Sequence, residues 1–419
     1  MRPRFSASMF ALAALFCGCS NNSDDSRGSN DNNSDGGTPA FSDDTIQELQ
    51  AIVDDERAAD SVPGIIVGVW IPGQGEWVSG TGVADTSGGT TAVPEDTFRI
   101  ASITKSFTAT VVLQLVQEGR LRLDDPLSNY VPEVPLASEI TIRMLLGHTS
   151  GIFTYTKDDG FNAALFATPT KAWTPEELVD LAVAHPADNA PGAAFSYSNT
   201  NYVLLGMIAE QITGTRIEDE VKKRIFDELG MSSSSFPKTG ETTMATPVMH
   251  GYWALQTGGY QDFAVLEPST HWTSGAVVST VKDMKVWAEA LATGSLLSAD
   301  IQTQRVAWHD AFDVDSQYGL GILKYGDFIG HDGTLPGYDS VMYYLPSRKA
   351  TFVALANTCG ATHPPKIVFQ KIVQLLMPEE ANWKLLEGES DAGAAGADSG
   401  AAEADSETAG TDAWAGSAD

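Results

Sequence analysis

The patterned part of the chain begins with a helical repeat and continues with strands. Apolar residues in 44–58 are spaced as on one face of a helix. The stretches 64–70 and 76–84 are rich in β-branched residues and flank the turn sequence IPGQG, which predicts a β-hairpin. A third short strand is expected at 97–101.

From Ser102 onward the pattern is helical and apolar on nearly every side, so we expect a helix that is buried in the middle of the domain and ends near Gly119. Helical patterns dominate residues 121–270. Strand patterns return at 274–280, 318–323, 327–333, 340–346 and 350–357, interrupted by a helix at 281–291 and followed by one at 365–377. This order predicts an α+β fold, in which a sheet is built from both ends of the core around an all-helical inserted subdomain at about 121–270.

Both ends of the chain lack a core pattern. Residues 1–19 carry two arginines ahead of an apolar run that is too short to span a membrane, which is typical of an export signal. Gly18 before Cys19 favours a lipoprotein-type signal in which Cys19 is acylated; ordinary cleavage is the alternative. Residues 20–40 predict an unfolded linker and residues 387–419 an acidic, unfolded tail, which leaves 41–386 as the folded domain.

Charge and cysteine content exclude several classes of function. The formal net charge is −30, and most of it lies in the folded domain, so the surface repels phosphate backbones and no nucleic-acid partner is expected. If the signal is removed and Cys19 is acylated, Cys359 has no cysteine to pair with, and no disulfide is expected. The sequence contains no CxxC pair and no HExxH, so a zinc site has no support, and no cofactor is expected.

A serine and a lysine one helical turn apart form the first candidate catalytic motif. Ser102 lies where helix N–H groups are still unpaired, and Lys105 shares its face of the helix. A hydroxyl needs a proton acceptor to attack an acyl carbon, and a lysine in an apolar site is a suitable acceptor. The same S-x-x-K spacing recurs at Ser279 and Lys282, but there Thr280 and Asp283 predict a capping box that exposes the lysine.

A second motif is the Y-x-N of Tyr197 and Asn199. A phenol near a lysine ammonium can shuttle a proton, and an asparagine amide can hold a substrate carbonyl. Ser198 or Asn199 is also suited to cap the helix that follows, and both functions are compatible.

The third motif is expected on a strand beside the nucleophile, where K-T-G is common. The literal K-T-G at 238–240 lies in a loop sequence rich in serine, with proline and glycine. His331, Asp332 and Gly333 fit better, because they end a predicted strand that turns directly into the next one, and Gly333 would let a substrate backbone approach the strand.

With these motifs in this order, the chain resembles the serine β-lactamase and D-alanyl-D-alanine carboxypeptidase superfamily over about residues 45–377. Its Y-x-N and H-x-G variants look most like Streptomyces-type DD-carboxypeptidases and class C β-lactamases, with related esterases close by. The resemblance implies an antiparallel sheet flanked by helices. It also implies a metal-free reaction through an acyl-enzyme.

The resemblance assigns a role to each motif residue. Ser102 would be the nucleophile, Lys105 and Tyr197 would share the general base and acid roles, and Asn199 would orient the substrate. His331 would supply a positive or hydrogen-bonding edge. The backbone N–H groups of Ser102 and Thr334 would form the oxyanion hole. Gly333 and Asp332 would line the substrate edge, and Trp272 matches a site-wall position, although it could equally be a core aromatic.

Asp332 departs from the superfamily pattern. Relatives carry a hydroxyl or small residue there, where it meets the carboxylate of a D-alanine terminus or β-lactam. Asp332 would repel that carboxylate if its side chain faced the site rather than the opposite face of the strand. Such repulsion favours ester or amide hydrolysis over peptidase or lactamase activity.

The sequence therefore predicts an exported serine hydrolase of the cell envelope, held at a membrane by a lipid anchor. Its expected partner is a small peptide or ester substrate, with D-alanyl peptides of the cell wall first and small esters or β-lactams as alternatives. A penicillin-binding receptor that is acylated without turnover and a scaffold with an inactive hydrolase fold are further alternatives.

Overall fold

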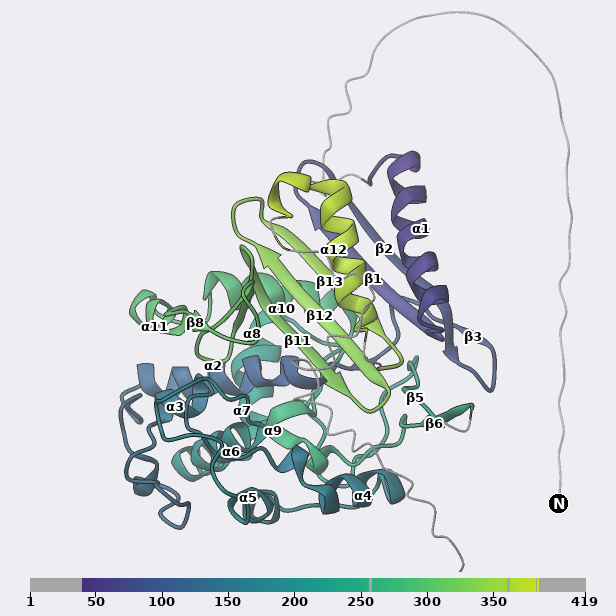
Figure 1. Ribbon diagram of the computed structural model, residues 1–419. Coiled ribbons are helices and arrows are strands. Elements are labelled where there is room, and N and C mark those ends of the chain that lie inside the picture. The colour runs from purple at the N-terminus through teal and green to yellow at the C-terminus, as the bar shows by residue number, and fades with distance from the viewer. Residues whose placement is uncertain (1–39, 256–257, 360–361, 382, 384–419) are drawn as a thin grey trace, which may run out of the picture. The chain divides into compact units, whose positions relative to one another are not determined.

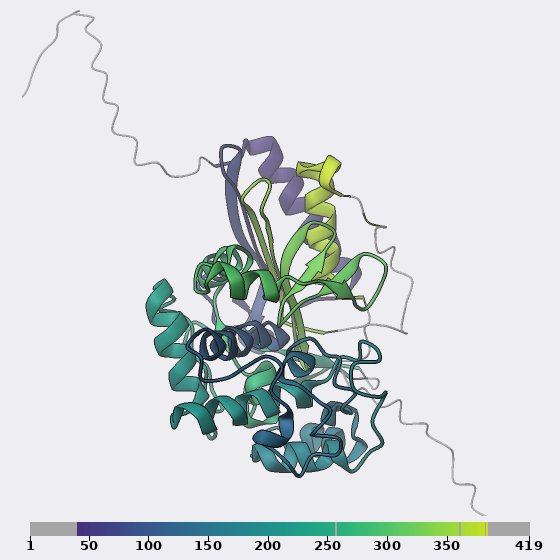
Figure 2. The ribbon, with the colours of Figure 1, turned by 90° about the vertical axis from the view of Figure 1, so that its left-hand side faces the viewer.

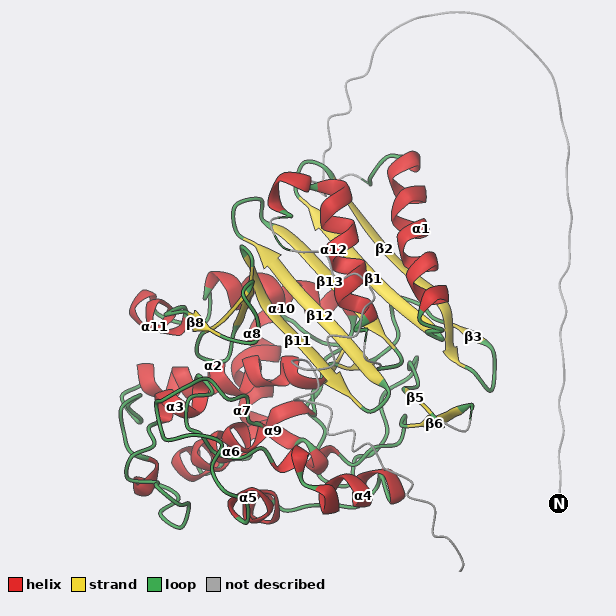
Figure 3. Ribbon diagram, in the orientation of Figure 1, coloured by secondary structure: helices red, strands yellow, loops and turns green. Residues whose placement is uncertain are grey.

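A nine-stranded antiparallel sheet organises the described part of the chain (Figures 1 and 3). The structure, a computed structural model, describes residues 40–255, 258–359, 362–381 and 383. The strand order is β3-β2-β1-β13-β12-β11-β10-β9-β8. The strands are β1 (Gly64–Ile71), β2 (Gly75–Asp85), β3 (Thr90–Thr91), β8 (His309–Asp310), β9 (Ser316–Tyr318), β10 (Leu323–Tyr325), β11 (Phe328–Leu335), β12 (Tyr338–Leu345) and β13 (Ala350–Ala356). Because β1 pairs with β13, with Ile65 opposite Ala356, the sheet is built from both ends of the core, as the sequence predicted.

Helices cover both faces of this sheet. Helices α1 (Asp43–Ala59) and α12 (Pro364–Leu376) lie on one face, and α10 (Val281–Thr293) lies on the other (Figure 1). Alternate side chains of β12 enter the two cores: Val341 and Tyr343 pack with α12, while Met342 and Tyr344 belong to the other cluster. Strands β1, β12 and β13 are buried along their whole length, which explains their nearly continuous apolar sequences.

The helical part gathers below the sheet in Figure 2. The turn η1 (Ala101–Ile103) leads into α2 (Thr104–Gln117), which is buried over most of its length and contacts α6 (Asn199–Thr213) and α9 (Trp272–Gly275). The other helices are α3 (Ile142–Leu146), α4 (Asp159–Ala167), α5 (Pro175–Val183), α7 (Ile217–Val221), α8 (Asp227–Leu229) and α11 (Ala299–Arg305). The expected central buried helix is therefore present. No helix among the residues that the structure describes is long and apolar enough to cross a membrane.

Four predictions need correction. The strands expected at 97–101 and 274–280 are reduced to β4 (Phe98–Arg99) and β7 (Val278–Ser279), which pair in a separate two-stranded sheet. The strand expected at 318–323 falls mainly on the turn between β9 and β10. The insertion is not all helical, because it contains the hairpin of β5 (Tyr252–Ala254) and β6 (Tyr260–Asp262). Tyr252 donates its N–H to the Asn357 carbonyl, so contacts with the chain after β13 stabilise a strand that its own short sequence does not specify.

Candidate active site

Ser102 lies in the tight turn that precedes α2. Ala101 just before it has a φ of 50°, in the left-handed region that residues with a Cβ rarely adopt. Two hydrogen bonds to Val277 hold the turn: Ile100 N–H donates to the Val277 carbonyl (3.1 Å), and Val277 N–H donates to Thr104 Oγ1 (3.0 Å). The serine is therefore presented at the start of the central helix by a locally constrained backbone.

Lys105 is fully buried one turn beyond the serine. Its Nζ donates to Ser102 Oγ over 2.8 Å and to the Ser274 carbonyl over 3.0 Å. The same nitrogen lies 4.7 Å from the centre of the Tyr197 ring. The first and second sequence motifs thus meet at one point, and the Nζ–Oγ contact gives a direct path for a proton from the serine to the lysine.

Tyr197 rests against a histidine that has no motif role in the sequence. Its ring is stacked on His148 with a centroid distance of 4.1 Å, and Phe312 packs nearby at 5.4 Å. The His148 Nδ1 accepts the N–H of Ser198, which fixes the chain next to the tyrosine. Burial, helped by the charge of Lys105, lowers the pKa of His148 well below its usual range. His148 is therefore a neutral support for Tyr197.

Asn199 begins α6 and is buried. Its backbone N–H donates to Thr154 Oγ1 (3.1 Å), and its side-chain Nδ2 donates to Thr156 Oγ1 (3.0 Å). Ser198 occupies the N-cap position without a capping hydrogen bond from its side chain. The start of α6 is thus held against the loop at 154–156, and this loop orients the Asn199 amide.

Strand β11 approaches the nucleophile at Gly333. A Cβ placed on this glycine would lie 2.6 Å from both the Ile100 carbonyl oxygen and the Ser102 nitrogen. Ser340, opposite Gly333 on β12, donates its hydroxyl to the carbonyls of Ile100 and Gly333, each over 3.1 Å. Only glycine lets the strand come so close to the serine, so the third motif contributes first through its backbone.

His331 lies on the same face of β11 as Gly333 and is buried. Its Nδ1 contacts the carbonyl of Asp332, which can only accept, so Nδ1 carries the proton and donates. Its Nε2 is 2.9 Å from the hydroxyl of Tyr318. The imidazole therefore has polar partners inside the protein on both of its nitrogens.

The side chain of Asp332 lies on the opposite face of the strand. Its partner across the ladder is Val341, which packs in the core beside α12, whereas the partner of Gly333 is Ser340 on the face of Ser102. Alternation along a strand sends neighbouring side chains to opposite faces. This alternation directs the Asp332 carboxylate away from the face of Ser102, while its Oδ1 lies 3.9 Å from His331 Nδ1. Its role as a substrate-binding residue stays a prediction.

Thr334 follows Gly333 on the same strand, so its backbone nitrogen lies near the nucleophile. Its hydroxyl donates to Asp339 Oδ1 over 3.2 Å, and this carboxylate also accepts the N–H of Ser340. The oxyanion hole formed by the Ser102 and Thr334 N–H groups stays a prediction. The threonine hydroxyl, in contrast, is directed to a carboxylate of the protein.

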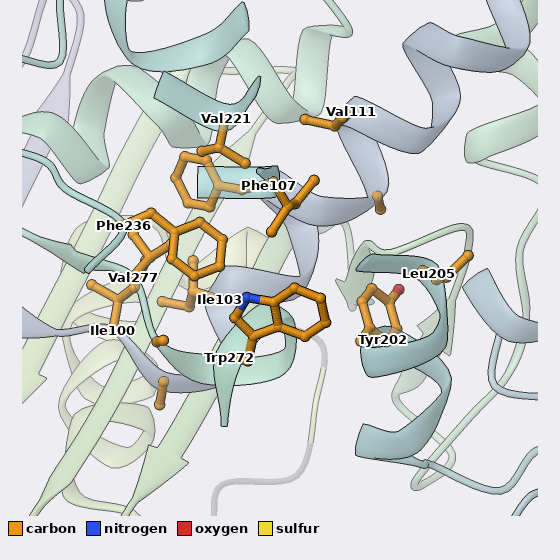
Figure 4. Packing of buried hydrophobic residues seen from close by; sticks show 14 of the residues in the cluster. Ile100, Ile103, Phe107, Val111, Tyr202, Leu205, Val221, Phe236, Trp272 and Val277 are labelled. Atoms are coloured by element: carbon orange, nitrogen blue, oxygen red, sulfur yellow. The ribbon is translucent and has the colours of Figure 1, made fainter. Parts of the chain in front are cut away.

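Trp272 is buried in the apolar core. Its indole Nε1 donates to Glu218 Oε1 over 3.0 Å, and the ring packs in the apolar cluster with Ile103 and Phe107 of the central helix region (Figure 4). A Cβ on Gly206 of α6 would lie 3.0 Å from the tip of the ring. Of the two readings that the sequence left open for this residue, the structure supports the core aromatic.

The second S-x-x-K, at Ser279 and Lys282, and the literal K-T-G at 238–240 lie outside the candidate active site. Lys282, the lysine of the second S-x-x-K, extends to Glu95 with a largely exposed side chain, while Ser279 contacts Ser234. Lys238 of the literal K-T-G pairs with Asp219. Neither lysine shares a site with a serine nucleophile.

Sequence reasoning did not find His148 or Tyr318. Both are buried among the motif residues, and both lie in short segments bounded by glycines, LLGHTSG and QYGLG. Glycines that flank a polar residue indicate a tightly packed backbone, and this pattern is the sequence signal that could have identified both residues. Cys19, the predicted lipidation site, lies outside the described residues.

A serine with a buried lysine one turn later, beside strand β11 of an antiparallel sheet, defines the class of serine hydrolases with a lysine partner. The comparisons with known proteins agree with this class. The chain belongs to the Beta-lactamase family, whose family model matches residues 45–375.

Three relatives illustrate this membership. A D-stereospecific amidohydrolase from Streptomyces sp. is 32% identical, with a TM-score of 0.67, over 74% of this chain and 94% of that one. The D-amino acid amidase of Ochrobactrum anthropi, solved with D-phenylalanine, is 27% identical, with a TM-score of 0.71, over 80% and 99%. Penicillin-binding protein PbpX of Bacillus subtilis is 28% identical over 68% of each chain.

Proposed function

We propose that this protein hydrolyses amide bonds of D-amino acid derivatives through an acyl-enzyme on Ser102. The observation that carries the proposal is the 2.8 Å contact between Ser102 Oγ and the buried Lys105 Nζ. Support for the D-configuration comes from the similarity to a D-stereospecific amidohydrolase and a D-amino acid amidase. C-terminal D-alanyl peptides and D-amino acid amides are the two members of this substrate class.

The reaction follows from the arrangement of the side chains. Ser102 Oγ attacks the carbonyl carbon as its proton passes to the amine of Lys105, and the carbonyl oxygen becomes negatively charged between the N–H groups of Ser102 and Thr334. Tyr197, against the same lysine, delivers a proton to the leaving nitrogen as the C–N bond breaks. A water molecule then attacks the acyl-enzyme and gives a proton to the Tyr197 phenolate; the acyl–Oγ bond breaks, Lys105 returns its proton to Ser102 Oγ, and the acid is released.

The edge of β11 favours a substrate without a carboxylate. The Thr334 hydroxyl, which could donate to such a group, donates to Asp339, and the Nδ1–H of His331 donates to the Asp332 carbonyl. We therefore place D-amino acid amides before D-alanyl peptides. D-amino acid esters, which also lack a carboxylate, are expected to react as well, because they present the same acyl group.

Initial rates separate these substrates. The full chain is assayed with D-alanine amide, its L-enantiomer, and a peptide ending in D-alanyl-D-alanine, each with wild type and Ser102→Ala. We expect turnover of the D-amide above the D-alanyl peptide, little turnover of the L-amide, and none by Ser102→Ala. Equal rates for the two enantiomers would refute D-specificity, and a faster peptide would make the protein a carboxypeptidase.

A receptor that is acylated without turnover is the second candidate, supported by the similarity to PbpX. Intact-mass measurements after addition of a β-lactam and of a p-nitrophenyl ester, followed over time, distinguish the two. An adduct that forms and disappears is expected for the hydrolase. A lasting adduct with both reagents would favour the receptor.

We also propose that the protein is exported and held at a membrane by a lipid on Cys19, on the basis of the apolar run and the small residue before this cysteine. Detergent-phase partitioning of the native protein tests it. Cys19→Ser is expected to move the protein to the aqueous phase. Unchanged partitioning and processing would contradict the anchor.

A further inference from the structure

Tyr318 is a fully buried tyrosine at the end of β9 with its hydroxyl 2.9 Å from His331 Nε2. The glycines that follow it fix its place relative to the catalytic helix. A Cβ on Gly321 would lie 2.2 Å from the Ala109 Cβ of α2, and one on Gly319 would lie 2.2 Å from the Arg305 carbonyl oxygen. The backbone that carries Tyr318 is therefore packed tightly between α2 and the chain at Arg305.

The ring of Tyr318 connects the second and third motifs. It packs edge-on against His148 at a centroid distance of 4.9 Å and against Tyr197 at 6.3 Å, while His331 lies at 5.6 Å. Phe195 closes another side at 5.8 Å. A shift of this ring would therefore displace both Tyr197 and His331.

The direction of the hydrogen bond follows from the acceptor on the other side of the imidazole. Because His331 Nδ1 donates to the Asp332 carbonyl, Nε2 of the neutral ring is a lone pair that accepts from Tyr318. Burial, followed by the neighbouring Tyr202 and Tyr197, raises the pKa of Tyr318 well above its usual value. Tyr318 thus keeps its proton at neutral pH and is able to donate it.

We propose that Tyr318 is a positioning residue that acts through His331. Its hydroxyl donates to Nε2 of the Nδ1–H tautomer that the Asp332 carbonyl already requires, and it thereby fixes the ring plane, so that the backbone of β11 on either side of His331 stays aligned with Ser102. The kinetic consequence rests on the proposed function, since it assumes that His331 takes part in the reaction. The structural consequence, the hydrogen bond that His331 Nε2 accepts, does not depend on it.

Tyr318→Phe removes the hydroxyl of Tyr318 and keeps the ring with its aromatic packing, so it tests the hydroxyl alone. Tyr325→Phe is the matched control, because Tyr325 is also a buried tyrosine of this sheet, accepts a hydrogen bond from Gln370 Nε2 (2.7 Å), and packs in the core beside α12. Both variants remove one hydrogen-bonded buried hydroxyl. Only Tyr318→Phe removes a hydroxyl that is bonded to His331.

Ring nitrogen-15 spectra of the histidine-labelled full chain give the direct measurement, since the chain has seven histidines. The His331 signals are assigned by their loss in His331→Gln. We expect the neutral imidazole of wild type and of Tyr325→Phe to show a protonated Nδ1 and an unprotonated Nε2. In Tyr318→Phe the Nε2 signal should move, because its lone pair loses the tyrosine donor, while Nδ1 keeps its proton against the Asp332 carbonyl. An unchanged His331 spectrum in Tyr318→Phe would overturn the proposal.

Kinetics supply the second measurement. Loss of one hydrogen bond to a positioned group should lower kcat for a D-amino acid ester about three- to tenfold in Tyr318→Phe. Tyr325→Phe should stay within about twofold of wild type. In a His331→Gln background, adding Tyr318→Phe should cost less than about twofold, because coupled residues are not additive. If the fold-losses in kcat of the two single variants multiply in the double variant, Tyr318 does not act through His331.

Failure of the proposed function gives a different result. If wild type turns over no substrate, or if Ser102→Ala keeps its activity, the function is wrong, while the hydrogen bond at His331 Nε2 is still read from the spectrum. If turnover is normal and Tyr318→Phe leaves both spectrum and kcat unchanged, the inference about Tyr318 alone is wrong.

Discussion

Gly333→Ala is the substitution that best tests how the strand and the nucleophile are held together. The added methyl group would lie 2.6 Å from the Ile100 carbonyl oxygen and from the Ser102 nitrogen, and 3.0 Å from the Ala101 Cβ. An ordinary contact of a carbon is about 3.5 Å, so β11 and the turn before α2 must separate by roughly 0.9 Å. The neighbouring atoms are mostly backbone and cannot rotate away.

The size of the effect follows from that separation. A displacement of about 1 Å between reacting groups costs up to about 100-fold in rate, so we expect kcat to fall between about 10- and 100-fold. Overpacking also costs about 1–3 kcal/mol of unfolding free energy. The expected result is a folded, slightly destabilised enzyme that is acylated slowly.

The assay measures kcat for a D-amino acid ester together with the denaturant midpoint of unfolding. Gly160→Ala is the control, since Gly160 is exposed in α4 and its added Cβ would meet only the Asp158 side chain, at 3.1 Å. This control should keep both rate and stability. If Gly333→Ala folds and retains kcat within about twofold, the close approach of β11 is not what forms the site.

Three further predictions concern other side chains. Ser102→Ala should abolish covalent labelling by a β-lactam, whereas Ser279→Ala should leave it unchanged; label recovered on a peptide containing Ser279 would contradict the assignment. Burial would lower the pKa of His363, but Asp339 at 3.3 Å outweighs it and raises this pKa above the usual value of about 6.5. Wild type should therefore have a larger free energy of unfolding than His363→Gln. This difference should be fully present below a pH of about 6.5 and should decline as the pH rises through the raised pKa of His363. A difference that grows with pH would refute this. Burial raises the pKa of the Cys359 thiol to about 12, so iodoacetamide should modify it only after unfolding, and rapid labelling of the native protein would show otherwise.

The sequence predicted the elements whose pattern is local. The long strands β1, β2, β11, β12 and β13 and the buried helix after Ser102 carry their signals within a few residues. The choice of Ser102 over Ser279 was also available, because a predicted helix cap at Thr280 placed Lys282 in an exposed first turn. The predicted capping box forms only in part, since Thr280 accepts the Asp283 N–H while the Asp283 carboxylate accepts from Ser233 and Ser234.

The parts that escaped prediction depend on contacts between distant segments. Whether Asp332 faced the site could not be decided, because a shift of one residue in strand register exchanges the two faces. His185 pairs with Asp158 and His250 with Asp262, and these pairings could not be predicted because the partners are 27 and 12 residues apart in the sequence. The stacking of His148 on Tyr197 likewise joins segments that only the folded insertion brings together.

The pairing of β1 with β13 has a consequence for how activity arises. Strands from the two ends of the domain are neighbours in the sheet, and contacts so distant in sequence form slowly because a long loop must close first. A growing or truncated chain that ends before β11 already contains Ser102, Lys105 and Tyr197 but lacks Gly333 and the sheet that supports it. Reactivity should therefore appear only once the C-terminal strands are in place, so that labelling of Ser102 reports the completion of folding.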